Sequence, residues 1–246
     1  MKRAAGIAVT ILLALIAIAP PLVAIAQASH VSDYAYVVNT YGDALLFSLR
    51  LATCVVLGSL AIAVPAAYAI VRHPFPGARL LERIAIVPLT LPGVTVAIAL
   101  ITASGALRGS VLVLAAGQML YTIAYVVGVM TAALRTAGLD ELDAAARTLG
   151  AKHVERFVRI TLPLLVHPIV VSALIAFAIS WGEFNVSYLL ATPLKMPFAA
   201  ALYGTYISNS PAISGAATAI FVAGALPFLI GIQLLERRPF EFGEGV

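Results

Sequence analysis

Charged residues are scarce in this sequence of 246 residues. Only 11% of the residues are Asp, Glu, Lys or Arg, whereas 62% are hydrophobic, and the mean hydropathy is +1.03. A water-soluble core of this length is not compatible with such a composition, so a soluble domain is excluded. The sequence instead predicts an all-α polytopic membrane protein, in which glycines and prolines scattered through the apolar segments allow kinked, closely packed helices.

Cysteine and the usual catalytic patterns are almost absent. The single Cys54 lies in an apolar run, which excludes a disulfide pair or a metal cluster and predicts a small buried side chain. The four histidines lie in different segments, and there is no His-Glu-x-x-His, Gly-x-Ser-x-Gly or Cys-x-x-Cys pattern. No lysine follows a glycine, so no loop that cradles nucleotide phosphates is present. We therefore expect no catalytic residue and no metal site, and no cofactor bound by this chain.

Long apolar runs are what the sequence does contain. A bilayer core of about 30 Å needs about 20 apolar helical residues. Six such spans are predicted, near Ala5–Ala26, Leu45–Ile70, Ile84–Ser104, Val111–Leu134, Leu164–Leu190 and Gly215–Leu235. The first run also resembles a cleavable secretory signal, but it is longer than the roughly 7–15 residues of a signal core, so we expect a retained helix.

The basic residues predict the orientation, because Lys and Arg near short loops stay on the cytoplasmic side. With both termini in the cytoplasm, twelve Lys and Arg residues lie inside and only Arg50, Arg108 and Lys195 lie outside. The net charge of +4 is thus a signal of topology, not of nucleic-acid binding. The expected location is the bacterial cytoplasmic (inner) membrane.

A polar segment between the fourth and fifth spans predicts a helical elbow. Asp140, Glu141 and Asp143 suit the positive end of a helix dipole, and three alanines follow them. Gly150 then predicts a stop in the left-handed conformation. A second short helix is expected from Lys152 to Ile160, ended by Pro163. The pattern fits equally a surface that docks on a cytoplasmic protein and an amphipathic loop lying on the membrane.

The same segment resembles the EAA loop of binding-protein-dependent ABC importer permeases of type I, with the pattern Glu-Ala-Ala-x3-Gly-x9-Ile-x-Leu-Pro. Ala144 stands at the glutamate position and Asp143 lies one residue earlier, whereas the rest of the spacing is complete. The resemblance implies a coupling helix that contacts an ATPase. The coupling residues are then Asp143, Ala144, Ala145, Ala146, Gly150, Ala151, Ile160, Leu162 and Pro163.

The resemblance also implies domains and partners. Residues 1–42 would hold the first span and an extracytoplasmic loop, 43–235 the permease domain with its EAA loop at about 140–163, and 236–246 a cytoplasmic tail. The partners would be a cytoplasmic ABC ATPase dimer, a second identical or homologous permease subunit, an extracytoplasmic substrate-binding protein and the lipid bilayer, with no nucleic acid. ATP and Mg²⁺ would bind to the ATPase.

The segment Ser180–Ser187 resembles the fifth span of permeases for spermidine/putrescine, ferric iron and phosphonate, and chain length favours the polyamine type. Glu183 is the carboxylate placed well within a predicted span, which favours a cationic solute. Helix rise, however, places it about 28 Å along the span, where it is equally compatible with solvation. Glu183, Asn185, Tyr121 and Tyr125 are the candidate pathway residues, and Trp181 is expected to be an interfacial anchor.

A secondary transporter driven by an ion gradient is the rival from a different class. Such proteins usually show internal repeats and intramembrane ionisable residues, and neither is evident here beyond Glu183.

Overall fold

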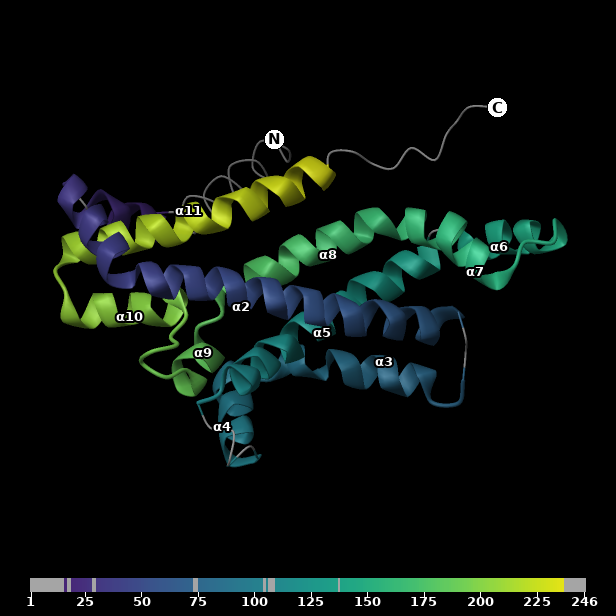
Figure 1. Cartoon of the computed structure of the whole chain (residues 1–246), viewed down its shortest axis with the longest axis horizontal. Coiled ribbons are helices and arrows are strands. Elements are labelled where there is room, and N and C mark those ends of the chain that lie inside the picture. Colours follow the sequence, from purple (N-terminus) through teal and green to yellow (C-terminus); the bar gives the residue numbers. More distant parts are fainter. Residues whose placement is uncertain are drawn as a thin grey trace, which may run out of the picture.

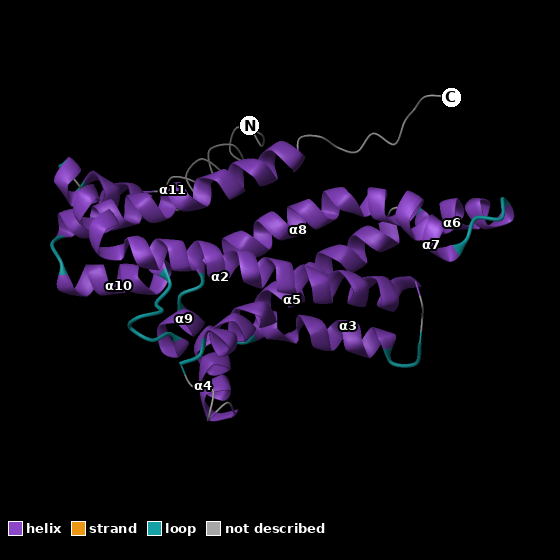
Figure 2. Ribbon diagram, viewed as in Figure 1, coloured by secondary structure: helices purple, strands orange, loops and turns teal. Residues whose placement is uncertain are grey.

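The chain is described by a computed structural model over Ile16 and residues 19–27, 30–72, 75–103, 105, 109–136 and 138–236. In this part of the chain all named elements are helices, and Figure 2 shows only helices and connecting loops. The α-helices are α2 (Val31–Arg72), α3 (Ala78–Ile86), α4 (Gly93–Ala103), α5 (Val111–Thr136), α6 (Leu139–Thr148), α7 (His153–Arg156), α8 (Leu162–Gly182), α9 (Asn185–Leu190), α10 (Phe198–Ser208) and α11 (Pro211–Glu236).

Four described helices are long and apolar enough to cross a membrane: Val31–Arg72, Val111–Thr136, Val154–Gly182 and Pro211–Leu235. A fifth crossing is possible through a pair of helices, Ala78–Thr90 and Gly93–Ala103, bent by 106°. Most of the first predicted span lies outside the described residues, although 19–26 are helical. The prediction of an all-α polytopic membrane protein is confirmed.

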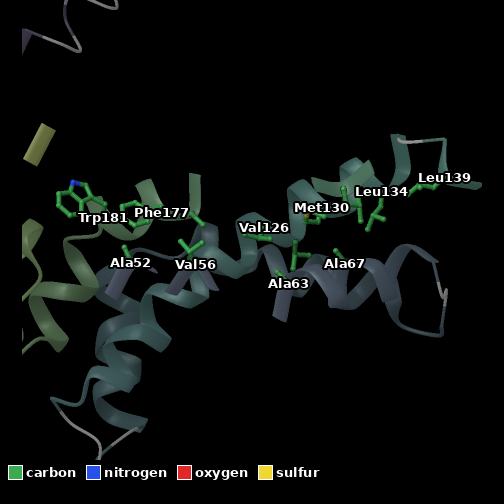
Figure 3. Close-up of a cluster of buried hydrophobic side chains, with 13 residues drawn as sticks. Ala52, Val56, Ala63, Ala67, Val126, Met130, Leu134, Leu139, Phe177 and Trp181 are labelled. Atoms are coloured by element: carbon green, nitrogen blue, oxygen red, sulfur yellow. The ribbon is translucent and has the colours of Figure 1, made fainter. Parts of the chain in front are cut away.

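The centre of the bundle is the contact between α2 and α5, with α8 packed on both and α11 on α8 and α2 (Figure 1). Figure 3 shows how α2 and α5 approach closely: two of the buried residues of α2, Ala63 and Ala67, are small and face Val126 and Met130 of α5. Lipid offers no hydrophobic driving force between helices, so this close packing is a main source of stability.

The third predicted span, Ile84–Ser104, is not straight. The helix α3 continues into a 3₁₀ turn at Val87–Thr90, and the chain then bends before α4 begins at Gly93. Leu91 has extended backbone angles (φ −89°, ψ 133°), as expected for a residue that precedes a proline. Pro92 therefore sets the bend.

The fifth predicted span, Leu164–Leu190, is also interrupted. The helix α8 ends at Gly182, and α9 begins only at Asn185. At the other end, Pro163 does not stop the preceding helix as predicted, because it falls in the first turn of α8, directly after a π-helical turn at Phe157–Thr161. In the predicted outer loop 191–214, the segment Phe198–Ser208 forms the helix α10.

Two side-chain predictions were wrong. Cys54 is exposed on α2 instead of buried. Trp181 is buried, with only 4% of its surface exposed, and is not an interfacial anchor. Its indole N–H donates to the carbonyl of Phe221 (3.2 Å), and its ring lies against Gly224 of α11. The missing side chain at Gly224 thus makes room for a bulky ring between α8 and α11.

This close approach makes Gly224 a stringent test of the packing. A Cβ atom there would lie 2.5 Å from Cζ2 of Trp181, so Gly224→Ala is expected to destabilise the protein by about 1–3 kcal/mol. Gly128 is the matched control, because a Cβ atom there meets nothing within 4 Å. We expect thermal unfolding in detergent to shift down for Gly224→Ala and to stay level or rise for Gly128→Ala. Equal melting temperatures would refute this packing.

Candidate functional site

The polar segment between α5 and α8 forms the predicted elbow, defined here as residues 139–158. Its first helix, α6, ends at Thr148, and Gly150 has φ +84°. The amide of Gly150 donates to the carbonyl of Arg147 (3.1 Å), and the amide of Ala151 donates to that of Ala146 (3.0 Å). These two bonds form a Schellman motif, which satisfies the last carbonyls of α6. The predicted helix and its glycine stop are confirmed.

Asp143 ties the elbow to the bundle. Its Oδ1 accepts a hydrogen bond from Nε of Arg156 (2.8 Å), and its Oδ2 lies 3.5 Å from Nη2 of Arg72 at the end of α2. Both arginine side chains are only 12% exposed, and that of Asp143 is 23% exposed. One carboxylate therefore joins three segments: α2, α6 and α7. Arg72 lies 71 positions before Asp143, and the sequence predicted for it only a place among the basic residues on the cytoplasmic side.

The elbow carries exposed apolar side chains on both of its arms. Leu142 and Leu149 of the first arm are 45% and 87% exposed, and Val154 and Val158 of the second arm are 74% and 51% exposed. Figure 1 places α6 and α7 at one extreme end of the molecule, beyond the other helices. Exposed apolar side chains at such a tip indicate a contact surface. We call Leu142, Leu149, Val154 and Val158 the tip residues.

The remaining coupling residues divide between surface and interior. Ala144, Ala145, Gly150, Leu162 and Pro163 are exposed, and Ala146 and Ala151 are partly buried. Ile160 packs against the core of the bundle. The second arm and the turn that follows it also have a buried side, because Thr161 is buried and Phe157 packs edge-on against Tyr68 of α2, with ring centroids 5.2 Å apart. The second arm is therefore anchored on one side and open on the other.

The candidate pathway residues lie around the two helix breaks. The carboxylate of Glu183 accepts hydrogen bonds from the amides of Val186 and Ser187 and from the hydroxyl of Ser187, each at 2.8 Å. These contacts cap the start of α9, where backbone N–H groups lack partners within the helix. The carboxylate is thus engaged in holding the break between α8 and α9.

The two breaks face each other. A Cβ atom at Gly93, the start of α4, would lie 2.7 Å from Cβ of Asn185, the start of α9. The hydroxyl of Tyr121 in α5 donates a hydrogen bond to the carbonyl of Leu91, the residue at the bend (3.1 Å). Asn185 is exposed, whereas Tyr121 and Tyr125 are half-buried. The structure brings Tyr121, Glu183 and Asn185 to one region of discontinuous helices, an arrangement often found at transport sites.

A buried polar network supports this region. Gln118 of α5 is 1% exposed; its amide donates to the hydroxyl of Ser187 (2.9 Å), and its carbonyl accepts from Ser180 of α8 (2.5 Å). One turn further, the hydroxyls of Thr122 and Ser59 lie 2.6 Å apart. These bonds connect α2, α5, α8 and α9. The network could not be predicted from the sequence, because the bonded partners on different helices are 62, 63 and 69 residues apart.

Comparison with known proteins places these features in a family. Residues 55–241 match the family model described as the binding-protein-dependent transport system inner membrane component. The chain is 33% identical to the molybdenum transport system permease protein ModB of Escherichia coli, over 76% of this chain and 89% of that protein. It is 32% identical to ModB of Mycobacterium tuberculosis, over 71% of this chain and 72% of that protein.

The fold is also that of solved transporter chains. A chain from the crystal structure of a bacterial ABC transporter involved in the import of the acidic polysaccharide alginate superimposes with a TM-score of 0.77 at 18% identity. The match covers 98% of this chain and 96% of that one. Together with the family match, this shows that the chain belongs to the family of inner-membrane components of binding-protein-dependent transport systems.

Proposed function

We propose that this multi-pass inner-membrane protein is the permease subunit of an ATP-driven importer, and that its elbow docks on a cytoplasmic ATPase subunit. The observation that carries the proposal is the combination of an exposed apolar tip with a rigid attachment. Leu149 and Val154 are open at the tip, while Asp143 fixes the same elbow to α2 through Arg72. A loop that rests on lipid needs the first feature but not the second.

The attachment suggests how force would pass into the membrane. The second arm of the elbow runs without a break through the π-helical turn into α8, and Asp143 links the first arm to α2. The helices α2 and α8 also pack on each other in the bundle. A movement of the ATPase would therefore tilt two spans together and so open and close a pathway between them and their neighbours.

The proposal includes the partners of such a system. ATP and Mg²⁺ would be held by an ATPase dimer, so this chain would have no catalytic role. A second permease subunit and an extracytoplasmic binding protein would complete the importer, in line with the solved alginate ABC transporter in complex with a periplasmic protein carrying an alginate pentasaccharide. Both termini would lie in the cytoplasm with the elbow, as the distribution of basic residues predicts.

For the solute, we propose an oxyanion of the molybdate class. Several relatives are named as molybdenum or molybdate/tungstate permeases. The sequence-based expectation of a polyamine finds no support in them. It also loses its physical basis, because the carboxylate of Glu183 is occupied by three hydrogen bonds at the start of α9 and is not free to bind a cation.

Uptake into proteoliposomes tests the proposed function. The chain, its ATPase and its binding protein would be reconstituted together, and radiolabelled molybdate and putrescine would be compared with and without ATP inside the vesicles. We expect ATP-dependent uptake of molybdate, competed by tungstate. Uptake of putrescine instead would refute the proposed solute. Uptake by this chain alone in an ion gradient would refute the importer and favour a secondary transporter.

A further inference from the structure

A cleft of about 730 Å³ opens at the end of the bundle that carries the elbow, between the ends of α2 and α5 and the start of α3. Its lining is strongly basic: four arginines and a single glutamate contribute side chains, namely Arg72, Arg79, Arg83, Arg135 and Glu82. None of these residues belongs to the tip or to the helix breaks. Apart from Arg72, which pairs with Asp143 of the elbow, the lining has no part in the proposed docking or transport.

Two of the four arginines are already paired with a carboxylate. Arg135 donates two hydrogen bonds to the carboxylate of Glu82, each at 2.7 Å, and Arg72 pairs with Asp143. Arg79 and Arg83 are exposed, and neither forms an ion pair or a hydrogen bond with a described residue. They lie four positions apart, so both project from one face of α3. The cleft thus keeps two neighbouring positive charges for an anion.

The surface next to these arginines is apolar. Leu80, Ile84 and Val87 follow each other at helical spacing and are 62%, 54% and 47% exposed, and Phe75 at the entrance is 43% exposed. Leu80 and Phe75 also line the cleft. The stripe starts at the arginines and runs along α3 toward the bend at Pro92, that is, into the membrane. A ligand that fits would have an anionic head and an apolar tail.

We propose that this cleft binds an anionic phospholipid of the cytoplasmic leaflet, with its phosphate between Arg79 and Arg83 and an acyl chain along Leu80, Ile84 and Val87. Basic pockets at the cytoplasmic ends of membrane helices are suited to such head groups. The cleft also borders Arg72, which holds the elbow through Asp143, so a bound lipid would brace α3 beside the coupling device. This proposal rests on the proposed function, which places the end of the bundle that carries the elbow on the cytoplasmic side.

Lipid titration of the full-length chain in detergent, followed by native mass spectrometry, tests the proposal. We expect phosphatidylglycerol to bind in preference to phosphatidylcholine. The double variant Arg79→Gln/Arg83→Gln is expected to lower phosphatidylglycerol affinity about 30-fold, which corresponds to about 2 kcal/mol at about 1 kcal/mol for each basic residue. The control Arg147→Gln/Arg159→Gln removes two charges outside the cleft and is expected to change the affinity less than threefold.

Equal loss of affinity in the two double variants, or equal binding of the two lipids, would overturn the proposal. Displacement of phosphatidylglycerol by equimolar inorganic phosphate would overturn it as well, because the site would then recognise a free anion and not a lipid. Thermal unfolding of each variant shows whether it is folded, and the exposed positions of Arg79 and Arg83 predict unchanged stability. The readout is binding, so a failure of transport cannot be mistaken for a failure of this site.

Discussion

Replacing Asp143 with alanine is expected to reduce ATP-driven uptake by about 30-fold to 100-fold while the protein remains folded in the membrane. The change leaves Arg156 and Arg72, each 12% exposed, without their shared carboxylate. Breaking a buried ion pair costs about 3–5 kcal/mol, and partial exposure here reduces this to about 2–3 kcal/mol. A free-energy loss of this size lowers the population of elbows held in the docking orientation by about 30-fold to 100-fold, and uptake falls with it.

Glu155→Ala is the matched control for Asp143→Ala. Glu155 also pairs with an arginine of the elbow, Arg159 (3.2 Å), but the two side chains are 43% and 77% exposed. Such a surface pair contributes about 0.2–1 kcal/mol, so uptake is expected to change less than fivefold. Uptake and solute-stimulated ATP hydrolysis would be measured on the same proteoliposomes. If both variants transported like the unmodified protein, the elbow would not need its attachment to the bundle.

Replacing Glu183 with alanine is expected to destabilise the protein strongly. Among the described residues, the carboxylate is the hydrogen-bond partner of the amides of Val186 and Ser187 at the start of α9, and each hydrogen bond to a charged group contributes about 1.5–3 kcal/mol. Ser187 also accepts from Gln118, so the loss extends into the buried network between α5 and α9. We expect a fall in melting temperature of more than 10 °C in detergent, together with loss of uptake.

Glu183→Gln separates this capping role from a role as a charge in the pathway. The amide of glutamine keeps one oxygen as an acceptor but turns its N–H₂ group toward the amide donors at the start of α9, so stability should fall to a value between those of Glu183→Ala and the unmodified protein. A pathway charge that does not support the fold would behave differently. In that case Glu183→Gln would alter solute affinity and leave the melting temperature unchanged, which would contradict the capping role.

The elbow could be predicted from the sequence because its determinants are local. Acidic residues at the start of α6, three alanines and Gly150 act within a few residues of each other, and the structure confirms the helix and its stop. The attachment through Arg72 could not be predicted, because it depends on how α2 and α6 meet in space. Spacing alone also left open whether the elbow docks on a protein or lies on lipid, a choice that depends on what surrounds it.

The two breaks show a second limit of the sequence. Hydropathy counts apolar residues and treats Ile84–Ser104 and Leu164–Leu190 as continuous spans, although Pro92 bends the first and Glu183 ends the second. A continuous second span would place Glu183 as a charge within the membrane, and the expectation of a cationic solute depends on that placement. In the structure the carboxylate of Glu183 caps the start of α9. The prediction for Trp181 was wrong for a related reason. The ring is buried because Gly224, which is distant in the sequence, leaves room for it on α11.

The most direct test of the account is a photocrosslink from the tip of the elbow. The single native cysteine is exposed, so Cys54→Ser gives a cysteine-free background for a photoreactive maleimide at Leu149→Cys, with Leu112→Cys at the start of α5 as the control. Leu149 and Leu112 are 87% and 74% exposed. In the assembled transporter, the docked elbow predicts a crosslink to the ATPase from position 149 and none from position 112. Crosslinks from position 149 to lipid alone, with the ATPase present, would contradict the account.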